Sequence, residues 1–277
     1  MISKGMPLRA SRFNGWRRSI DRGIFGLFVA QLVFLCVLIL MPNTRFAGVR
    51  WPEGVLIFLA AAAAVLSQLQ QLPAQNVFLA SLIILLIGGG IQTVGVLTGV
   101  PFGPFDYTGN FGEPLFDTLP VCAPLLWLVA ILVCRGVARL VLRPWRKMQT
   151  YGFWLIGVTA ALVVLLDFDL EPFATQVRHY WLWRPTRFPL DWYGAPVVNP
   201  LGWALTALLI LAFATPALIV KKPGPRQPAD YQPLLMWLLF AGLFATGAVA
   251  HRLWLAVGFI VASSTAVGVF ALRGGRW

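Results

Sequence analysis

The chain alternates long apolar runs with shorter polar segments. The runs are about 17–24 residues long, enough to cross a hydrocarbon core of about 30 Å as a helix. The pattern therefore predicts an all-α integral membrane protein with about eight transmembrane helices, in a single polytopic domain covering residues 1–277. The predicted spans are Ile24–Met41, Gly54–Leu72, Val77–Thr98, Leu119–Leu142, Gly152–Phe168, Leu201–Val220, Leu234–Ala250 and Leu253–Leu272.

Two segments break this pattern, residues 99–118 and 169–199. The first belongs to the stretch Gly99–Trp127, which holds five prolines and four glycines. We expect such a stretch to form neither helix nor strand interior, and irregular loops of this length are usually functional. Both segments are therefore predicted to be active-site loops.

The basic residues predict an orientation. If the basic N-terminal segment, residues 1–23, is cytoplasmic, 16 Lys and Arg residues lie on that side and 6 on the other. Positive residues favour the cytoplasmic side of a membrane. We therefore expect a multi-pass protein of the inner (cytoplasmic) membrane, with both termini cytoplasmic and both long loops outside.

Composition agrees with a membrane protein, because 58% of the residues are hydrophobic and only 12% are charged. The net charge of +12 is interpreted as anchoring to anionic membrane lipid, and no nucleic-acid partner is expected. Cys36, Cys122 and Cys134 fit no metal-site spacing, and we expect no disulfide. The chain has only two histidines, His179 and His251, which disfavours a di-iron or haem site.

Seven of the ten carboxylates cluster in two places: Asp106, Glu113 and Asp117, then Asp167, Asp169, Glu171 and Asp191. Asp167 ends an apolar run, and an ionisable group at the hydrocarbon boundary is by default a functional candidate. Its alternative role is to close a helix end. Asp106, beside Tyr107, is the second candidate, whereas Glu113 and Asp117 are interpreted as solvated. A shielded carboxyl pair can serve as general acid and base.

Aromatic residues are dense around these acids. Some belong to the belt that membrane proteins carry at the interface. The others could line a slot for a flat apolar substrate and stabilise a carbocation. The candidate substrate-binding residues are Phe102, Phe105, Trp127, Trp181, Trp183, Tyr193, Asn199 and Trp203.

Four elements of the sequence resemble one known family. They read TGVPFGPFDYT at Thr98–Thr108, LPVCAPLLW at Leu119–Trp127, DFDLEP at Asp167–Pro172 and GAPVVNPLGW at Gly194–Trp203. Together they are similar to the membrane-integral carotenoid biosynthesis family of CruF-type carotenoid 1′,2′-hydratases. The likeness covers Ile91–Trp203. It departs from the family at Glu171, where the family has Asp, and in the insertion Arg184–Asp191.

The resemblance implies addition of water to the terminal double bond of an acyclic carotenoid, without a cofactor or a metal. Protonation of the less substituted carbon would give a tertiary cation that water traps. Asp106 or Asp167 would be the acid and the other would orient water, with Tyr107, Glu171 and Asn199 completing the hydrogen bonds. The implied partners are a carotenoid or other long isoprenoid, membrane lipid and, as a further option, other enzymes of carotenoid synthesis.

Three alternatives stay open. A carotenoid cyclase would share the first proton transfer and trap the cation with an internal alkene. A membrane prenyltransferase would use the pairs Glu113/Asp117 and Asp167/Glu171 to hold Mg²⁺-diphosphate, although both pairs are expected on the outer face. A transporter or assembly subunit would relay protons, and its acids would be spread along several spans.

Overall fold

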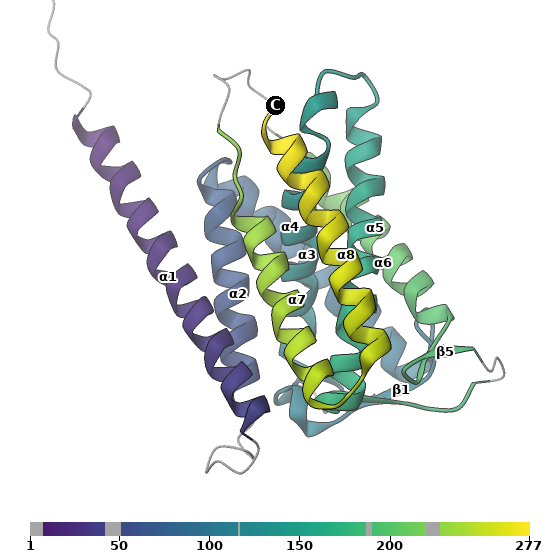
Figure 1. Ribbon diagram of the computed structural model, residues 1–277. Helices are drawn as coiled ribbons and strands as arrows, with labels where there is room; N and C mark the ends of the chain where they lie inside the picture. Colours follow the sequence, from purple (N-terminus) through teal and green to yellow (C-terminus); the bar gives the residue numbers. More distant parts are fainter. Residues whose placement is uncertain (1–7, 42–50, 116, 187–189, 220–227) are drawn as a thin grey trace, which may run out of the picture.

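The computed structural model describes residues 8–41, 51–115, 117–186, 190–219 and 228–277. Within these ranges eight helices are long and apolar enough to cross a membrane, which confirms the predicted fold class (Figure 1). They are α1 (Leu8–Leu40), α2 (Trp51–Leu69), α3 (Ala74–Thr98), α4 (Cys122–Val141), α5 (Tyr151–Pro172), α6 (Val198–Ala214), α7 (Gln232–Ala250) and α8 (Trp254–Gly275).

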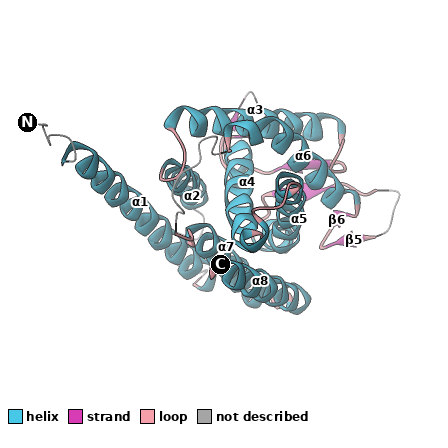
Figure 2. Cartoon of the chain, turned by 90° about the horizontal axis from the view of Figure 1, so that it is seen from above, coloured by secondary structure: helices cyan, strands magenta, loops and turns pink. Residues whose placement is uncertain are grey.

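Helix α4 is the centre of the bundle. It packs against α2, α3, α5, α7 and α8, and it is the most buried of the eight helices. Viewed along the bundle, α4 lies inside a ring of the other helices, while α1 runs along the periphery beside α2 and α7 (Figure 2). The candidate site is built around the first turns of this central helix.

Close packing of α3 on α4 depends on a glycine. A Cβ atom at Gly88 would lie 2.7 Å from Cβ of Trp127, whereas a Cβ at Gly90 would meet nothing within 4 Å. Small residues let helix backbones approach closely in membranes, and here the missing side chain leaves room for an indole.

We expect Gly88→Ala to lower the free energy of unfolding by about 1–3 kcal/mol, because Trp127 Cβ cannot move without shifting α4. Gly90→Ala is the matched control and should stay within about 1 kcal/mol of wild type. Thermal unfolding of the purified variants in detergent compares them. Equal unfolding temperatures for the two variants would contradict this packing.

One end of the bundle, which we call the loop end, carries three short antiparallel strand pairs (Figure 1). The pairs are β1 (Phe105–Tyr107) with β4 (Trp181–Trp183), β2 (Pro114–Leu115) with β3 (Leu119–Pro120), and β5 (Asp191–Trp192) with β6 (Ala195–Pro196). The expectation that the Gly- and Pro-rich segment excludes strand is therefore wrong. Gly103 and Pro104 precede β1 without interrupting it, and β4 supplies its hydrogen-bonding partner.

Helix α5 is longer than the apolar pattern predicts. It continues through Pro172 into one turn of π-helix, η3 (Phe173–Val177), so the expected loop boundary at residue 169 is wrong. Proline lacks the N–H that would bond to the carbonyl four residues earlier, at Phe168. The indole Nε1 of Trp192 donates to that carbonyl instead, at 3.0 Å. The helix thus carries Asp169 and Glu171 as well as Asp167.

Candidate active site

Two carboxylates and one amide form a buried cluster at the loop end. Asp167 and Glu171 lie four residues apart and therefore share one face of α5. Asn199, in the first turn of α6, donates from Nδ2 to Oδ2 of Asp167 at 3.0 Å and to Oε1 of Glu171 at 3.2 Å. The exposed fractions of Asp167 and Glu171 are 0% and 1%. One amide group therefore ties together two acids that have no contact with solvent.

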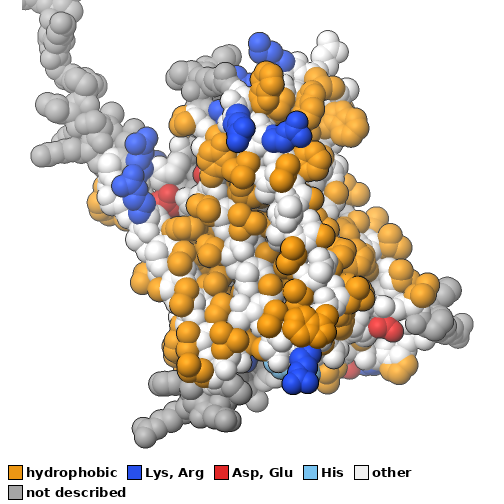
Figure 3. Space-filling model, in the orientation of Figure 1, with side chains coloured by type: hydrophobic (Ala, Val, Ile, Leu, Met, Phe, Trp, Pro, Cys, Tyr) orange, Lys and Arg blue, Asp and Glu red, His pale blue; other side chains and the backbone are white. Residues whose placement is uncertain are grey.

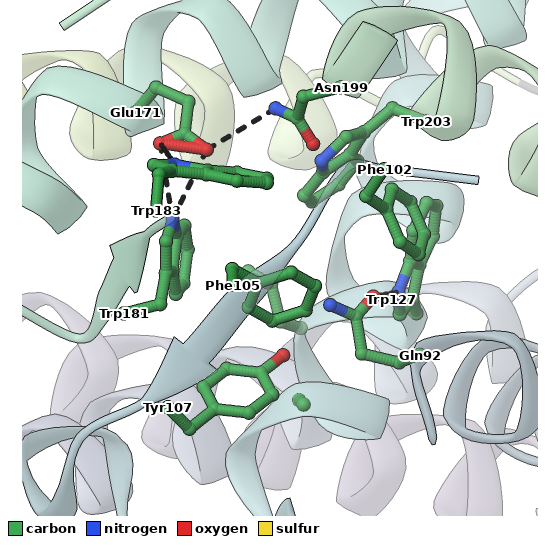
Figure 4. A pocket seen from close by; sticks show the side chains of 12 residues that line it. Gln92, Phe102, Phe105, Tyr107, Trp127, Glu171, Trp181, Trp183, Asn199 and Trp203 are labelled. Carbon is green, nitrogen blue, oxygen red and sulfur yellow. Dashed lines mark hydrogen bonds between the residues drawn. The ribbon is translucent and has the colours of Figure 1, made fainter. Parts of the chain in front are cut away.

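Two indoles complete the surroundings of Glu171. Trp181 Nε1 lies 3.2 Å from both carboxylate oxygens, and Trp183 Nε1 lies 3.5 Å from Oε2 (Figure 4). Alternate residues of a strand point to the same side, so β4 directs both indoles at Glu171. Their N–H groups stabilise negative charge on this carboxylate.

The cluster forms one wall of a small cavity. Its walls are mostly aromatic, and the rings of Trp127 and Trp203 lie 4.4 Å apart between centroids. The lining residues are Gln92, Phe102, Phe105, Tyr107, Ala123, Leu126, Trp127, Glu171, Trp181, Trp183, Asn199 and Trp203. The structure thus brings most of the candidate residues, drawn from α3 to α6 and both strands β1 and β4, to one place.

Tyr107 and Gln92 form the polar side of the cavity away from the carboxylates (Figure 4). The Gln92 side chain hydrogen-bonds to the Tyr107 hydroxyl, and its Oε1 accepts from Trp127 Nε1 at 3.0 Å. Burial raises the pKa of Tyr107 well above its usual value, so the side chain remains a neutral phenol. Sequence reasoning missed Gln92. The available signal was a lone amide within the apolar run Val77–Thr98.

Asp106 lies outside this cavity. Neighbouring residues of a strand point to opposite sides, so Tyr107 faces the cavity while Asp106 faces away, with 54% of its side chain exposed. Arg184 donates to it from Nε at 2.6 Å and from the guanidinium Nη2. This hydrogen-bonded cation lowers the pKa of Asp106 below its usual 3.8. The structure does not bring Asp106 together with Asp167 and Glu171.

We expect Asp106→Asn to keep product formation within about twofold of wild type, because exposed ion pairs contribute little. The lowered pKa keeps Asp106 ionised at neutral pH, and the pairing is lost only as the pH falls through that lowered pKa. Product formation in membranes, normalised to protein amount, checks this. A loss of product formation beyond tenfold at neutral pH would show that Asp106 takes part in catalysis.

Three other acidic or aromatic residues do not line the cavity. Tyr193 does not line the cavity, and its hydroxyl accepts from the backbone N of Ala256 at 3.1 Å, at the start of α8. Asp167 lies behind the cavity wall, in contact with Asn199. Asp169 faces α8, where Ser263 Oγ lies 3.0 Å from each of its two oxygens.

The fold and the site together define a polytopic membrane protein with a buried carboxyl pair beside an aromatic cavity. The family model described as "Carotenoid biosynthesis protein" matches residues 53–270, and the chain belongs to this family. The chain is also similar to the bisanhydrobacterioruberin hydratase of Haloarcula japonica, with 30% identity over 125 residues. That alignment covers 45% of this chain and 40% of the relative. No solved structure matches the chain.

Proposed function

We propose that this protein is a carotenoid hydratase, which adds water to the terminal 1′,2′ double bond of an acyclic carotenoid. The observation that carries the proposal is the Asp167–Asn199–Glu171 cluster at the wall of an aromatic cavity. Membership of the carotenoid biosynthesis family and the similarity to the bisanhydrobacterioruberin hydratase of Haloarcula japonica support the same chemistry.

Glu171 is the proposed acid, because of the two clustered carboxyls it is the one that lines the cavity. Two negative charges this close and this deeply buried would repel each other, so we assign one shared proton to the pair. Protonated Glu171 transfers its proton to the less substituted alkene carbon, and the positive charge develops on the neighbouring tertiary carbon. Asp167 keeps a compensating negative charge close to the cation.

The aromatic walls suit the next step. The faces of Phe105, Trp127 and Trp203 stabilise a cation in the cavity, while the indole N–H groups of Trp181 and Trp183 hold the Glu171 carboxylate. Water then forms the new C–O bond and returns one proton to Glu171. The Tyr107–Gln92 pair provides hydrogen bonds for that water. The balance is one alkene and one water giving one tertiary alcohol.

The position of the site fits a substrate dissolved in the membrane. The visible Lys and Arg side chains gather mainly at the end of the bundle opposite the strand pairs (Figure 3). By the positive-inside rule, the loop end would then face the outside of the inner membrane. A long polyene could place its terminal double bond there, at a boundary that water reaches.

Expression in a lycopene-producing host tests the proposal, with hosts that make γ-carotene or longer acyclic carotenoids in parallel. Mass analysis of the pigments should find a product heavier by one water in at least one host. A new pigment of unchanged mass would identify the cyclase alternative. Unchanged pigments in all hosts, with the protein present in the membrane, would contradict hydration.

A further inference from the structure

A second, narrow cavity lies inside the helix bundle between α2, α4, α5 and α7. It shares two wall residues, Leu126 and Trp203, with the cavity of the candidate active site. The two spaces are therefore neighbours separated by these two side chains. Nothing in the proposed proton transfer uses the second space.

The second cavity is an apolar shaft that starts at the loop end. Phe111 and Tyr180 line the part nearest the loop end, and Val133 on α4 lines the part farthest from it. Val133 follows Cys122, the first residue of α4, by eleven positions, which is about 16 Å along a helix. The shaft therefore reaches roughly the middle of a hydrocarbon core of about 30 Å. Its depth matches one leaflet.

One charged side chain, Glu53, interrupts the apolar wall. It is the third residue of α2 and only 2% exposed, so it lies buried near the loop end of the shaft. Its Oε1 pairs with Arg178, whereas its Oε2 has no hydrogen-bond partner within the part of the chain that the structure describes. A buried acceptor without a partner is costly, and a donor from a bound molecule would satisfy it.

We propose that this second cavity binds a long-chain isoprenoid alcohol, with its hydroxyl donating to Glu53 Oε2 and its apolar chain reaching toward the middle of the membrane. The hydroxyl then lies at the membrane boundary, as it does for an amphiphile within one leaflet. A phosphate headgroup does not fit, because the buried carboxylate of Glu53 would repel it. The choice of an isoprenoid rests on the proposed function, whose product is an apolar chain with one hydroxyl.

Equilibrium binding of radiolabelled geranylgeraniol to the protein in nanodiscs tests this inference. The reference ligand is the deoxy analogue with the same carbon skeleton, and empty nanodiscs correct for partition into lipid. A hydrogen bond to a charged group predicts about tenfold tighter binding of the alcohol to wild type. Val133→Trp, which fills the part of the shaft farthest from the loop end, should weaken binding of both ligands.

The double variant Glu53→Leu/Arg178→Leu removes the acceptor without leaving a buried charge unpaired. It should bind the two ligands equally, at the affinity of the deoxy analogue for wild type. Should this variant fail to fold, Glu53→Gln keeps the shape and should reduce the preference to about threefold or less. Asp169→Asn, a buried carboxyl facing α8, is the matched control and should keep the full preference.

Equal affinity of wild type for both ligands, or an unchanged preference in the Glu53 variants, would overturn the hydroxyl site. Undiminished binding of both ligands to Val133→Trp would show that they bind outside this cavity. Binding is measured without turnover. Failure of the hydration assay therefore leaves these results readable, and failure of this binding test leaves hydration at Glu171 unaffected.

Discussion

Replacement of Glu171 by Gln is expected to reduce carotenoid hydration by about a thousandfold, because general acid catalysis contributes about 10²–10⁴. The amide keeps the shape and can still accept from Trp181 and Trp183, but it has no proton to give to an alkene. Conversion of substrate by the purified variant in detergent, followed by chromatography, measures the loss.

Asp169→Asn is the matched control for Glu171→Gln. Asp169 lies two residues away on α5, is equally buried, and bonds to Ser263 instead of lining the aromatic cavity. It should retain product formation within a few fold of wild type. Equal loss of activity in both variants would mean that replacing any buried carboxyl on α5 impairs the protein, and proton donation by Glu171 would not explain the loss.

Asn199→Leu should lower kcat by about a hundredfold with little change in KM. The leucine has nearly the same size but removes the amide that donates to both Asp167 and Glu171. Without it, the two carboxyls repel each other and Glu171 leaves its position at the cavity wall. Asn199→Gln, which restores an amide on a longer side chain, should recover part of kcat.

Thr206→Val controls for loss of a buried polar group on the same helix. Thr206 is 1% exposed, and its hydroxyl has no hydrogen-bond partner among the described residues. Its removal should leave kcat and thermal stability close to wild type. A hundredfold loss in this variant would show that α6 tolerates no change, and Asn199 would lose its positioning role.

The hydrophobic pattern was sufficient to predict the helices, because each span must be apolar over the thickness of the membrane. It could not locate the end of α5. Pro172 normally signals a helix end, and here the indole of Trp192 supplies the hydrogen bond to the Phe168 carbonyl that Pro172 cannot donate. The pairing of Asp167 with Glu171 requires helix through residue 171, three residues beyond the apolar run, because the two side chains share a face only if both are helical.

The role of Asp106 could not be decided from the sequence, because Asp106 and Tyr107 are neighbours that a loop could direct to the same side. Once the segment is a strand, pairing with β4 turns one of them away from the cavity. Gln92 and Glu53 were overlooked for a different reason. Each is a single polar residue at the edge of, or within, an apolar run, and only packing shows which cavity it faces.

The most direct test of proton donation by Glu171 and trapping by water is turnover in solvent labelled with both deuterium and heavy oxygen. Mass spectrometry of the wild-type product should find one solvent hydrogen on the less substituted alkene carbon, C2′, and one solvent oxygen on the tertiary carbon, C1′, and Glu171→Gln should give almost no labelled product. Deuterium without oxygen, or equal labelling by Glu171→Gln, would contradict the account.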